Sequence, residues 1–317
     1  MLDFFKLNDL AARLEHAFGG RVCPMSFTPE QTDPFVLCVH HRHSFWSLDP
    51  IRPIFRLLLP EGFPAHPHRG FETVTYVLKG ALAHRDSTGV KQVYGADCVQ
   101  WMTAGFGMLH EEMWQTADVQ HELYQIWVNL PAHAKLNAPA IQMLGQGDFE
   151  ALDRIPVHSE TGCEVRVLSG DWHGHSSPVR TSSPVNILHA TVQPGATFTH
   201  ELPADFTCIV YVRKGEAVVH GNSASTAVPT FSTAFLARGG EVVEISCAED
   251  AREPADFLML AGQPLREPVV ASGSMVMNSD IQIQQAYSDY QRGLFGIPWD
   301  HKLSDDEWKS SLRKIQR

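Results

Sequence analysis

The sequence predicts an all-β protein made of two antiparallel β-barrels with a few flanking helices. Short runs of β-branched and aromatic residues recur along the chain, and Gly, Pro, Asp or Asn separates the runs. This texture is typical of antiparallel sandwiches and barrels of the jelly-roll type. The rhythm occurs twice in a chain of 317 residues, a length that suits about two domains of roughly 150 residues. We expect one barrel in residues 1–140 and a second in residues 141–317, together with the C-terminal helices.

The first series of predicted strands begins at Thr73. The run TVTYVLK ends at Gly80, and the run ALAHR continues to a turn at residues 86–89. Further strands are predicted for VKQVY, CVQWM, MLHEEMW and ELYQIWVNL. Their short length and regular spacing favour a closed antiparallel architecture.

A second series follows the polar stretch at residues 173–184. Its predicted strands are NILHATV, TFTHEL, FTCIVYVRKG, EAVVHG, TAFLARGGEVVEI and ADFLMLAG. The segment VLKGALAH in the first half aligns with VRKGEAVVH in the second around a shared Lys-Gly. We interpret this as a duplicated barrel unit.

Three amphipathic stretches are predicted to be helices. Asn8 can cap the first, near the N-terminus. Ser279 with Gln282, and Ser304 with Glu307, form capping boxes ahead of the other two. Their apolar stripes indicate packing against the barrels.

Composition excludes several classes of protein. Hydrophobic residues make up 44% of the chain and charged residues 19%, which excludes a mainly disordered chain. Lys and Arg total 25 against 36 Asp and Glu, a net charge of −11. Without a run of basic residues, this field repels a phosphate backbone and argues against direct nucleic-acid binding. No stretch approaches the roughly 20 apolar residues that span a bilayer, so we expect no membrane association.

The cysteines indicate a reducing compartment. The six cysteines are widely spaced and form no C-x-x-C motif. We expect reduced, mostly buried thiols. The N-terminus also lacks the basic and apolar regions of a secretory signal. We therefore expect a cytoplasmic protein.

Two short segments carry paired metal-ligand residues. His66 and His68 stand two residues apart in FPAHPHRGFE, and His110 and Glu112 stand two residues apart in LHEE. Extended backbone points residues i and i+2 to the same side. On neighbouring strands, the two pairs would bring three imidazoles and one carboxylate together inside the barrel. Such a set suits a divalent first-row transition metal with positions left open for water, O2 or substrate.

Other histidines provide a comparison. The HHRH run at residues 40–43 and the pair His173 and His175 are assigned to surface loops. An isolated H-x-H is more often a pair of solvated side chains than a metal site. What distinguishes the first barrel is therefore the partner segment with His110. His84, on the following strand, can face the pocket as a supporting group.

At these residues the sequence resembles the pirin family of the cupin superfamily. FPAHPHRGFETVTYVLKG, GADCVQWMTAGFGMLHEEM and QIWVNLP are similar to one family signature, and GQPLREPVVASGSMVMN with the following helix and GLFG to another. The resemblance covers most of the chain from Gly62 onward. It implies a bicupin with one metal, usually iron, in the N-terminal barrel, bound by residues matching His66, His68, His110 and Glu112.

Three carboxylates compete for the fourth ligand position. Glu72 lies four residues after the H-x-H, where many other cupins place a ligand. Glu111 should face away from His110, whereas Glu112 shares its face by the i, i+2 rule. The pirin-like match also places the carboxylate ligand at Glu112.

The second barrel is expected to hold no metal. It has Thr199-His200-Glu201 where the H-x-H would fall, and TAFLARGGEVVEI contains no histidine. A single imidazole does not rebuild the ligand set.

The resemblance implies two functions. The family includes members with quercetin 2,3-dioxygenase activity, which implies an iron-dependent enzyme that cleaves a flavonol-like phenolic with O2. Glu112 would act in turn as ligand and general base. The family also includes nuclear metal-dependent transcriptional co-regulators, which implies an iron-binding redox sensor that binds protein partners without turnover. A purely structural metal is disfavoured, since structural zinc sites have closed ligand sets rich in Cys.

Overall fold

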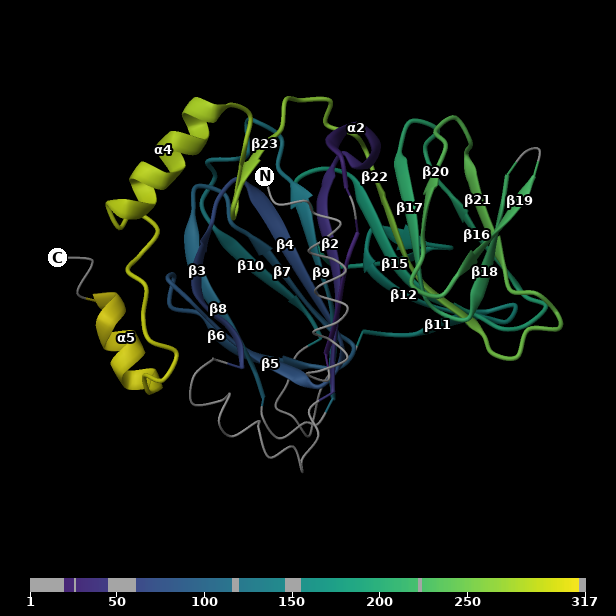
Figure 1. Cartoon of the computed structure of the whole chain (residues 1–317), viewed down its shortest axis with the longest axis horizontal. Helices are drawn as coiled ribbons and strands as arrows, with labels where there is room; N and C mark the ends of the chain where they lie inside the picture. The colour runs from purple at the N-terminus through teal and green to yellow at the C-terminus, as the bar shows by residue number, and fades with distance from the viewer. Residues whose placement is uncertain are drawn as a thin grey trace. The chain divides into compact units, whose positions relative to one another are not determined.

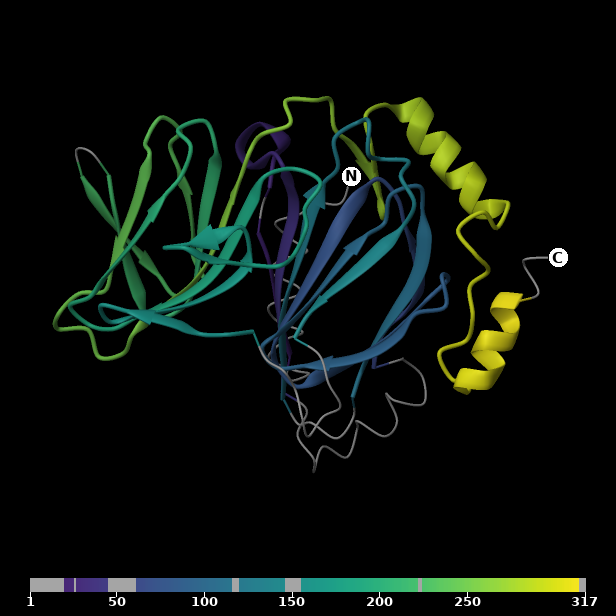
Figure 2. The same ribbon diagram turned by 180° about the vertical axis from the view of Figure 1, so that it is seen from behind.

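The computed structural model describes residues 20–25, 27–44, 61–115, 120–145, 155–221 and 224–313. These residues are mostly β, with antiparallel sheets and three helices (Figures 1 and 2). The predicted all-β class is therefore confirmed. The chain divides into two compact units, unit 1 drawn from 1–24, 37–154 and 267–317 and unit 2 from 25–36 and 155–266.

Unit 1 contains two large antiparallel sheets. Its strands are β1 (Gly20–Pro24), β2 (Phe35–Ser44), β3 (Gly62–His68), β4 (Phe71–Lys79), β5 (Ala81–Asp86), β6 (Lys91–Gly95), β7 (Cys98–Thr103), β8 (Met108–Trp114), β9 (Gln120–Asn129) and β10 (Ala140–Leu144). A six-stranded sheet has the order β1-β2-β9-β4-β7-β10, and a four-stranded sheet has the order β3-β8-β5-β6.

Unit 2 repeats this plan. Its elements are α2 (Pro29–Thr32), β11 (His158–Glu160), β12 (Cys163–Ser169), β13 (Asp171–Trp172), β14 (His175–Ser176), β15 (Val185–Val192), β16 (Thr197–Glu201), β17 (Thr207–Lys214), β18 (Glu216–His220), β19 (Ser225–Pro229), β20 (Thr233–Leu236), β21 (Val242–Ser246) and β22 (Ala255–Gly262). The larger sheet has the order β11-β12-β15-β22-β17-β20, and a four-stranded sheet has the order β16-β21-β18-β19. Strands β13 and β14 form a separate hairpin.

The two units share the topology of eight strands. The order β2-β9-β4-β7 in unit 1 matches β15-β22-β17-β20 in unit 2, and β3-β8-β5-β6 matches β16-β21-β18-β19. The Lys-Gly pairs mark the same turn in both, because Gly80 and Gly215 each follow a strand with a register shift and have φ of 76° and 66°. Glycine tolerates this left-handed conformation. The predicted duplication is confirmed.

The C-terminal segment packs on unit 1. It comprises β23 (Val270–Ser272), β24 (Met275–Met277), α4 (Asp280–Gln291) and α5 (Asp305–Arg313), and both helices lie beside the strands of unit 1 (Figure 1). A buried cluster joins Leu109 of β8 to Met275, Ile283, Phe295 and Trp308. Leu109 points away from the neighbouring His110 by strand alternation. The segment therefore covers the outer face of the four-stranded sheet, and a single boundary near residue 140 does not describe this grouping.

Arg69 fastens the same segment next to the H-x-H pair. Its Nη2 donates to Asp289 Oδ2 of α4 at 2.8 Å, and both side chains are buried. The guanidinium carbon lies 4.5 Å and 4.6 Å from the ring centres of Phe106 and Phe295. The turn after His68 is thereby fixed by an ion pair and two cation–π contacts.

Two of the predicted helix starts are confirmed. The Ser279 side chain accepts a hydrogen bond from the Gln282 backbone N–H at the start of α4. At the start of α5, Ser304 Oγ accepts from the Glu307 N–H, and the Glu307 carboxylate accepts from the Ser304 N–H. The helix expected after Asn8 lies outside the described residues.

The HHRH run at residues 40–43 is not a surface loop, and that prediction is wrong. The run lies on β2, where His40 and His41 are buried. His40 Nε2 lies 3.0 Å from Glu122 Oε1 of β9. A carboxylate on another strand thus gives a buried imidazole its hydrogen-bond partner, which a local reading of the sequence could not show.

Five of the cysteines are buried, as expected: Cys38, Cys98, Cys163, Cys208 and Cys247. None of the helices in the described part of the chain is long and apolar enough to cross a membrane.

One buried lysine ties three parts of unit 1 together. Lys135 Nζ donates to Gly70 O at 2.8 Å, Asn129 Oδ1 at 2.6 Å and Val276 O at 3.0 Å. These acceptors lie before β4, at the end of β9 and on β24. Burial lowers the pKa of Lys135 from 10.5 to about 7, and the charge of Glu267 partly opposes this shift.

Lys135→Met should lower the free energy of unfolding by about 2–4 kcal/mol, because three buried acceptors lose their donor. Above pH 7 the folded chain releases the Lys135 proton while the unfolded chain still holds it. The unfolded state then binds more protons, so wild-type stability gains from rising pH at this site. The variant lacks this pH-dependent gain. In urea unfolding, the difference in free energy of unfolding between wild type and variant should therefore increase from pH 7 to pH 9.5. The exposed Lys214→Met is the control. Equal deficits at both pH values would contradict the account.

Candidate metal centre

The paired strands β3 and β8 position the four predicted ligands. His66 and His68 lie on β3, and His110 and Glu112 lie on β8. The two strands are antiparallel neighbours, with His66 opposite His110 and Phe63 opposite Glu112. The two histidine-bearing segments are therefore adjacent in the sheet, as the sequence predicted.

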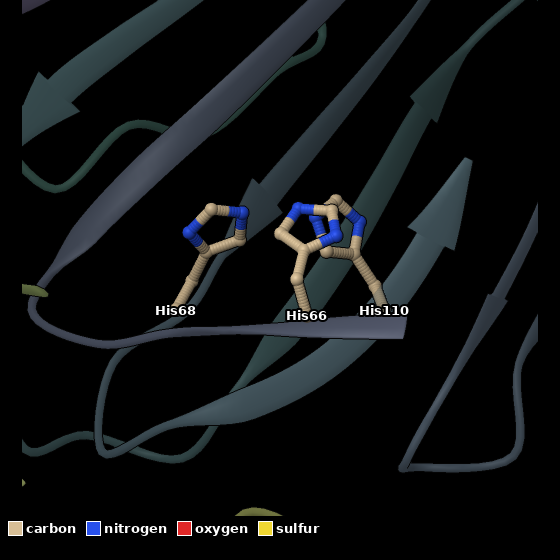
Figure 3. A group of neighbouring side chains, drawn as sticks. All are labelled: His66, His68 and His110. Carbon is tan, nitrogen blue, oxygen red and sulfur yellow. The ribbon is translucent and has the colours of Figure 1, made fainter. Parts of the chain in front are cut away.

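The three imidazoles converge. One ring nitrogen from each of His66, His68 and His110 lies within 4.8 Å of the others. The ring centres are 4.4 Å apart for His66 and His110, 4.7 Å for His66 and His68, and 4.8 Å for His68 and His110. Figure 3 shows the three rings grouped on one side of β3. His68 and His110 are buried, and His66 is half-buried.

Hydrogen bonding leaves ring nitrogens available on all three histidines. His66 Nδ1 lies 2.8 Å from Pro64 O. Because a carbonyl oxygen only accepts, Nδ1 carries the hydrogen and Nε2 keeps its lone pair. Both ring nitrogens of His110 are buried without a hydrogen-bond partner, and His68 keeps at least one ring nitrogen available, since its further polar contact is with the Ser274 backbone. Buried polar atoms left in this state are costly, and coordination of a metal would satisfy one on each ring.

Protonation also favours metal binding. Burial lowers the pKa of His68 and His110 well below 6.5, and the charges of neighbouring imidazoles lower it further. Both rings are therefore neutral near pH 7, which is the form that binds metals. The residues fit a divalent transition metal in donor type, convergence and protonation state.

Glu112 is fully buried close to this group but is held by other side chains. Its Oε1 accepts from Thr75 Oγ1 at 2.9 Å and from Tyr94 Oη at 2.5 Å, and its Oε2 accepts from Gln125 Nε2 at 3.2 Å. Burial and the charge of Glu112 raise the pKa of Tyr94 well above 10, so Tyr94 remains a donor. A carboxylate has about four acceptor positions, and three donors leave one of them open. Glu112 is not among the three converging residues.

The competing carboxylates point elsewhere. Glu111 Oε1 accepts from Arg85 Nε at 2.5 Å on the outer face of the sheet. Glu72 Oε1 accepts from Thr103 Oγ1 at 2.8 Å. Glu72 is three residues before Thr75 on β4, so alternation directs it to the face opposite Thr75 and its partner Glu112.

The sequence indicated His84 as a supporting group, but it did not indicate the hydrogen-bond partners of His84 and Glu112. His84 is fully buried, and its ring centre lies 5.5 Å from that of His110. Its hydrogen-bond partner Asp86 follows two residues later on the same strand, and the i, i+2 rule could have predicted that the two side chains share a face. Tyr94 and Gln125 come from other strands and give no local signal.

Among the residues that the structure describes, the second barrel has no comparable group. His200 on β16 stands opposite Val243 on β21, the strands that match β3 and β8. His200 Nε2 lies 2.7 Å from Asn186 Nδ2. His173 and His175 are exposed on the β13–β14 hairpin. Within the described ranges, His66, His68 and His110 are the one group of three suited to a metal.

Comparisons with known proteins agree with this architecture. The family description "Pirin" matches residues 20–128, and "Pirin C-terminal cupin domain" matches residues 187–296. Pirin-1 of Arabidopsis thaliana is 36% identical over 294 residues, covering 92% of this chain and 94% of that protein. Pirin of Homo sapiens is 36% identical over 251 residues, covering 78% of this chain and 83% of that protein.

A solved structure is similar over nearly the same extent. It is the crystal structure of quercetin 2,3-dioxygenase from Acinetobacter baumannii, with a TM-score of 0.73 and 31% identity over 87% of this chain and 91% of that one. The first matched description covers most of the strands of the first repeat and the three convergent histidines, and the second runs from β15 through β22 of the second repeat and on through α4. The chain belongs to the pirin family, as a bicupin with one cupin barrel in each repeat.

Proposed function

We propose that this protein is a metal-dependent dioxygenase of the quercetinase type, which cleaves a flavonol-like phenolic substrate with O2. The observation that carries the proposal is the convergence of three imidazoles, each of which has a ring nitrogen available to bind a metal. The similar structure named quercetin 2,3-dioxygenase supports the choice of reaction. Free, buried cysteines such as Cys38 and Cys208 support a cytoplasmic location.

The proposed ligands are His66 through Nε2, one ring nitrogen each of His68 and His110, and Glu112 through its open acceptor position. Imidazoles with a carboxylate and open positions suit Fe(II) among the first-row metals. A divalent metal held there would supply Lewis acidity, redox chemistry and coordination positions for the oxygens of the substrate and of O2.

The side chains of the barrel would prepare the substrate. The Glu112 carboxylate is the group placed to accept the proton of a substrate hydroxyl. Thr75, Tyr94 and Gln125 donate to it and so fix its orientation. Burial of His68 and His110 excludes water from that side of the site and strengthens these polar interactions.

The assay for the proposal is oxidation of quercetin by Fe(II)-loaded protein. We expect loss of the flavonol absorbance with consumption of O2, and neither change with His110→Ala. The alternative function, a redox sensor that binds protein partners, predicts stable iron binding without either change. That result would reject the dioxygenase.

Metal content should depend on the H-x-H pair of the first barrel and not on the H-x-H pair of the second unit. His68→Ala should abolish retention of metal through dialysis, because it removes one of three converging imidazoles. His175→Ala, in the exposed H-x-H of the second unit, is the matched control and should leave metal content unchanged. Elemental analysis should give at most one metal per chain. Two retained equivalents, the second lost with His200→Ala, would show a site in the second barrel.

Glu112 and Glu111 provide a test on adjacent residues. Glu112→Gln should weaken metal binding and lower turnover by about 10²–10⁴-fold, since an amide neither carries the charge nor acts as a base near neutral pH. Glu111→Gln should leave metal affinity and turnover nearly unchanged, although loss of the Arg85 pair lowers stability. Glu72→Gln should also retain the metal. Loss of metal in Glu72→Gln, with normal binding and turnover in Glu112→Gln, would reverse the assignment.

A further inference from the structure

A histidine–carboxylate pair stands on β5, next to the candidate metal centre. His84 and Asp86 are fully buried, and His84 Nε2 lies 3.1 Å from Asp86 Oδ2. Asp86 Oδ1 accepts from Thr88 N at 2.7 Å, Thr88 Oγ1 at 2.6 Å and Val90 N at 3.2 Å. The turn after β5 therefore fixes the carboxylate, and the carboxylate fixes the imidazole.

This arrangement determines which His84 nitrogen is available. A carboxylate accepts hydrogen bonds, so His84 Nε2 carries the hydrogen that faces Asp86. In the neutral ring, Nδ1 then has a lone pair. His84 Nδ1 is buried and has no hydrogen-bond partner. An acceptor in this position needs a donor from nearby.

His110 is the nearby ring that can supply this donor. In the register of β5 and β8, His84 stands opposite Glu112 and Asp86 stands opposite His110. The ring centres of His84 and His110 are 5.5 Å apart, close enough for a nitrogen of His110 to come within hydrogen-bond range of His84 Nδ1 by rotation of the His110 ring. Neither nitrogen of His110 has a partner. If one binds a metal, the other carries a hydrogen that needs an acceptor.

The second barrel acts as an internal comparison. Strands β18 and β21 match β5 and β8, and the pair that takes the place of His84 and Glu112 is Val219 and Ile245. Gly221 follows at the position of Asp86. Where the second barrel lacks the ligand set, it therefore also lacks the His84–Asp86 pair. The barrel fold therefore forms without a counterpart of His84 and Asp86, which favours a role for the pair at the metal site.

We propose that His84 and Asp86 are positioning residues for the metal ligand His110. One ring nitrogen of His110 binds the metal and the other N–H donates to His84 Nδ1, while His84 Nε2–H donates to Asp86. The chain of hydrogen bonds fixes the tautomer and orientation of His110. The inference rests on the metal site of the proposed function but not on its substrate. Partners of this kind typically contribute 10–100-fold to metal affinity.

Affinity for Co(II), measured by titration of metal-free protein, tests the chain. His84→Leu should weaken Co(II) binding 10–100-fold. His84→Gln can accept from His110 and donate to Asp86, and should restore part of that loss. Arg85→Met is the matched control, because Arg85 lies between the pair on the same strand but faces outward to Glu111. It should bind Co(II) within about threefold of wild type with an unchanged visible spectrum. Wild-type affinity in His84→Leu, or an equal loss in Arg85→Met, would overturn the proposal.

A second measurement does not depend on a variant. In ¹⁵N-labelled wild type loaded with Zn(II), the His110 N–H proton should be protected from exchange and show scalar coupling to His84 Nδ1. A solvent-exchanging His110 N–H without that coupling would overturn the proposal. Both measurements leave the reaction aside: wild-type protein that binds metal but spares quercetin rejects the dioxygenase only, whereas intact affinity in His84→Leu rejects the positioning chain only.

Discussion

Pairing of β3 with β8 is the constraint on which the candidate centre depends. The register that sets His66 opposite His110 gathers three imidazoles from segments about 40 residues apart in the sequence. A shift by one residue would turn His110 and Glu112 to the outer face and Glu111 to the inner one. The outer face helps to exclude this shift, because Leu109 packs with the C-terminal segment and Glu111 pairs with Arg85.

The four-stranded sheet thus has two faces with different chemistry. Its inner face carries the polar groups of the site, which are buried except for the half-buried His66. Its outer face is covered by β24, α4 and α5 through an apolar cluster. Arg85 contributes to this cover by donating to the carbonyl oxygens of His301 and Leu303. The C-terminal helices therefore support β3 and β8 from outside, which explains why they group with the first barrel.

Local pattern was sufficient to predict the fold class, the duplication, two helix starts and the three converging histidines. These features follow from alternation, turn residues and spacing along single segments, as at His66 and His68. Features that depend on distant pairing were missed. The burial of His40 depends on Glu122, and the orientation of Glu112 depends on Tyr94 and Gln125. No local signal in the sequence specifies these partners.

Anomalous diffraction from crystals of metal-loaded protein, recorded at the absorption edge of the metal, tests the central claim most directly. The account predicts one strong peak per chain, about 2.1 Å from one ring nitrogen of each of His66, His68 and His110. Glu112 should complete the ligand set while remaining hydrogen-bonded to Tyr94 or Gln125. A dominant peak at His200 or at His173 and His175, or a peak in the first barrel that His110 does not contact, would contradict it.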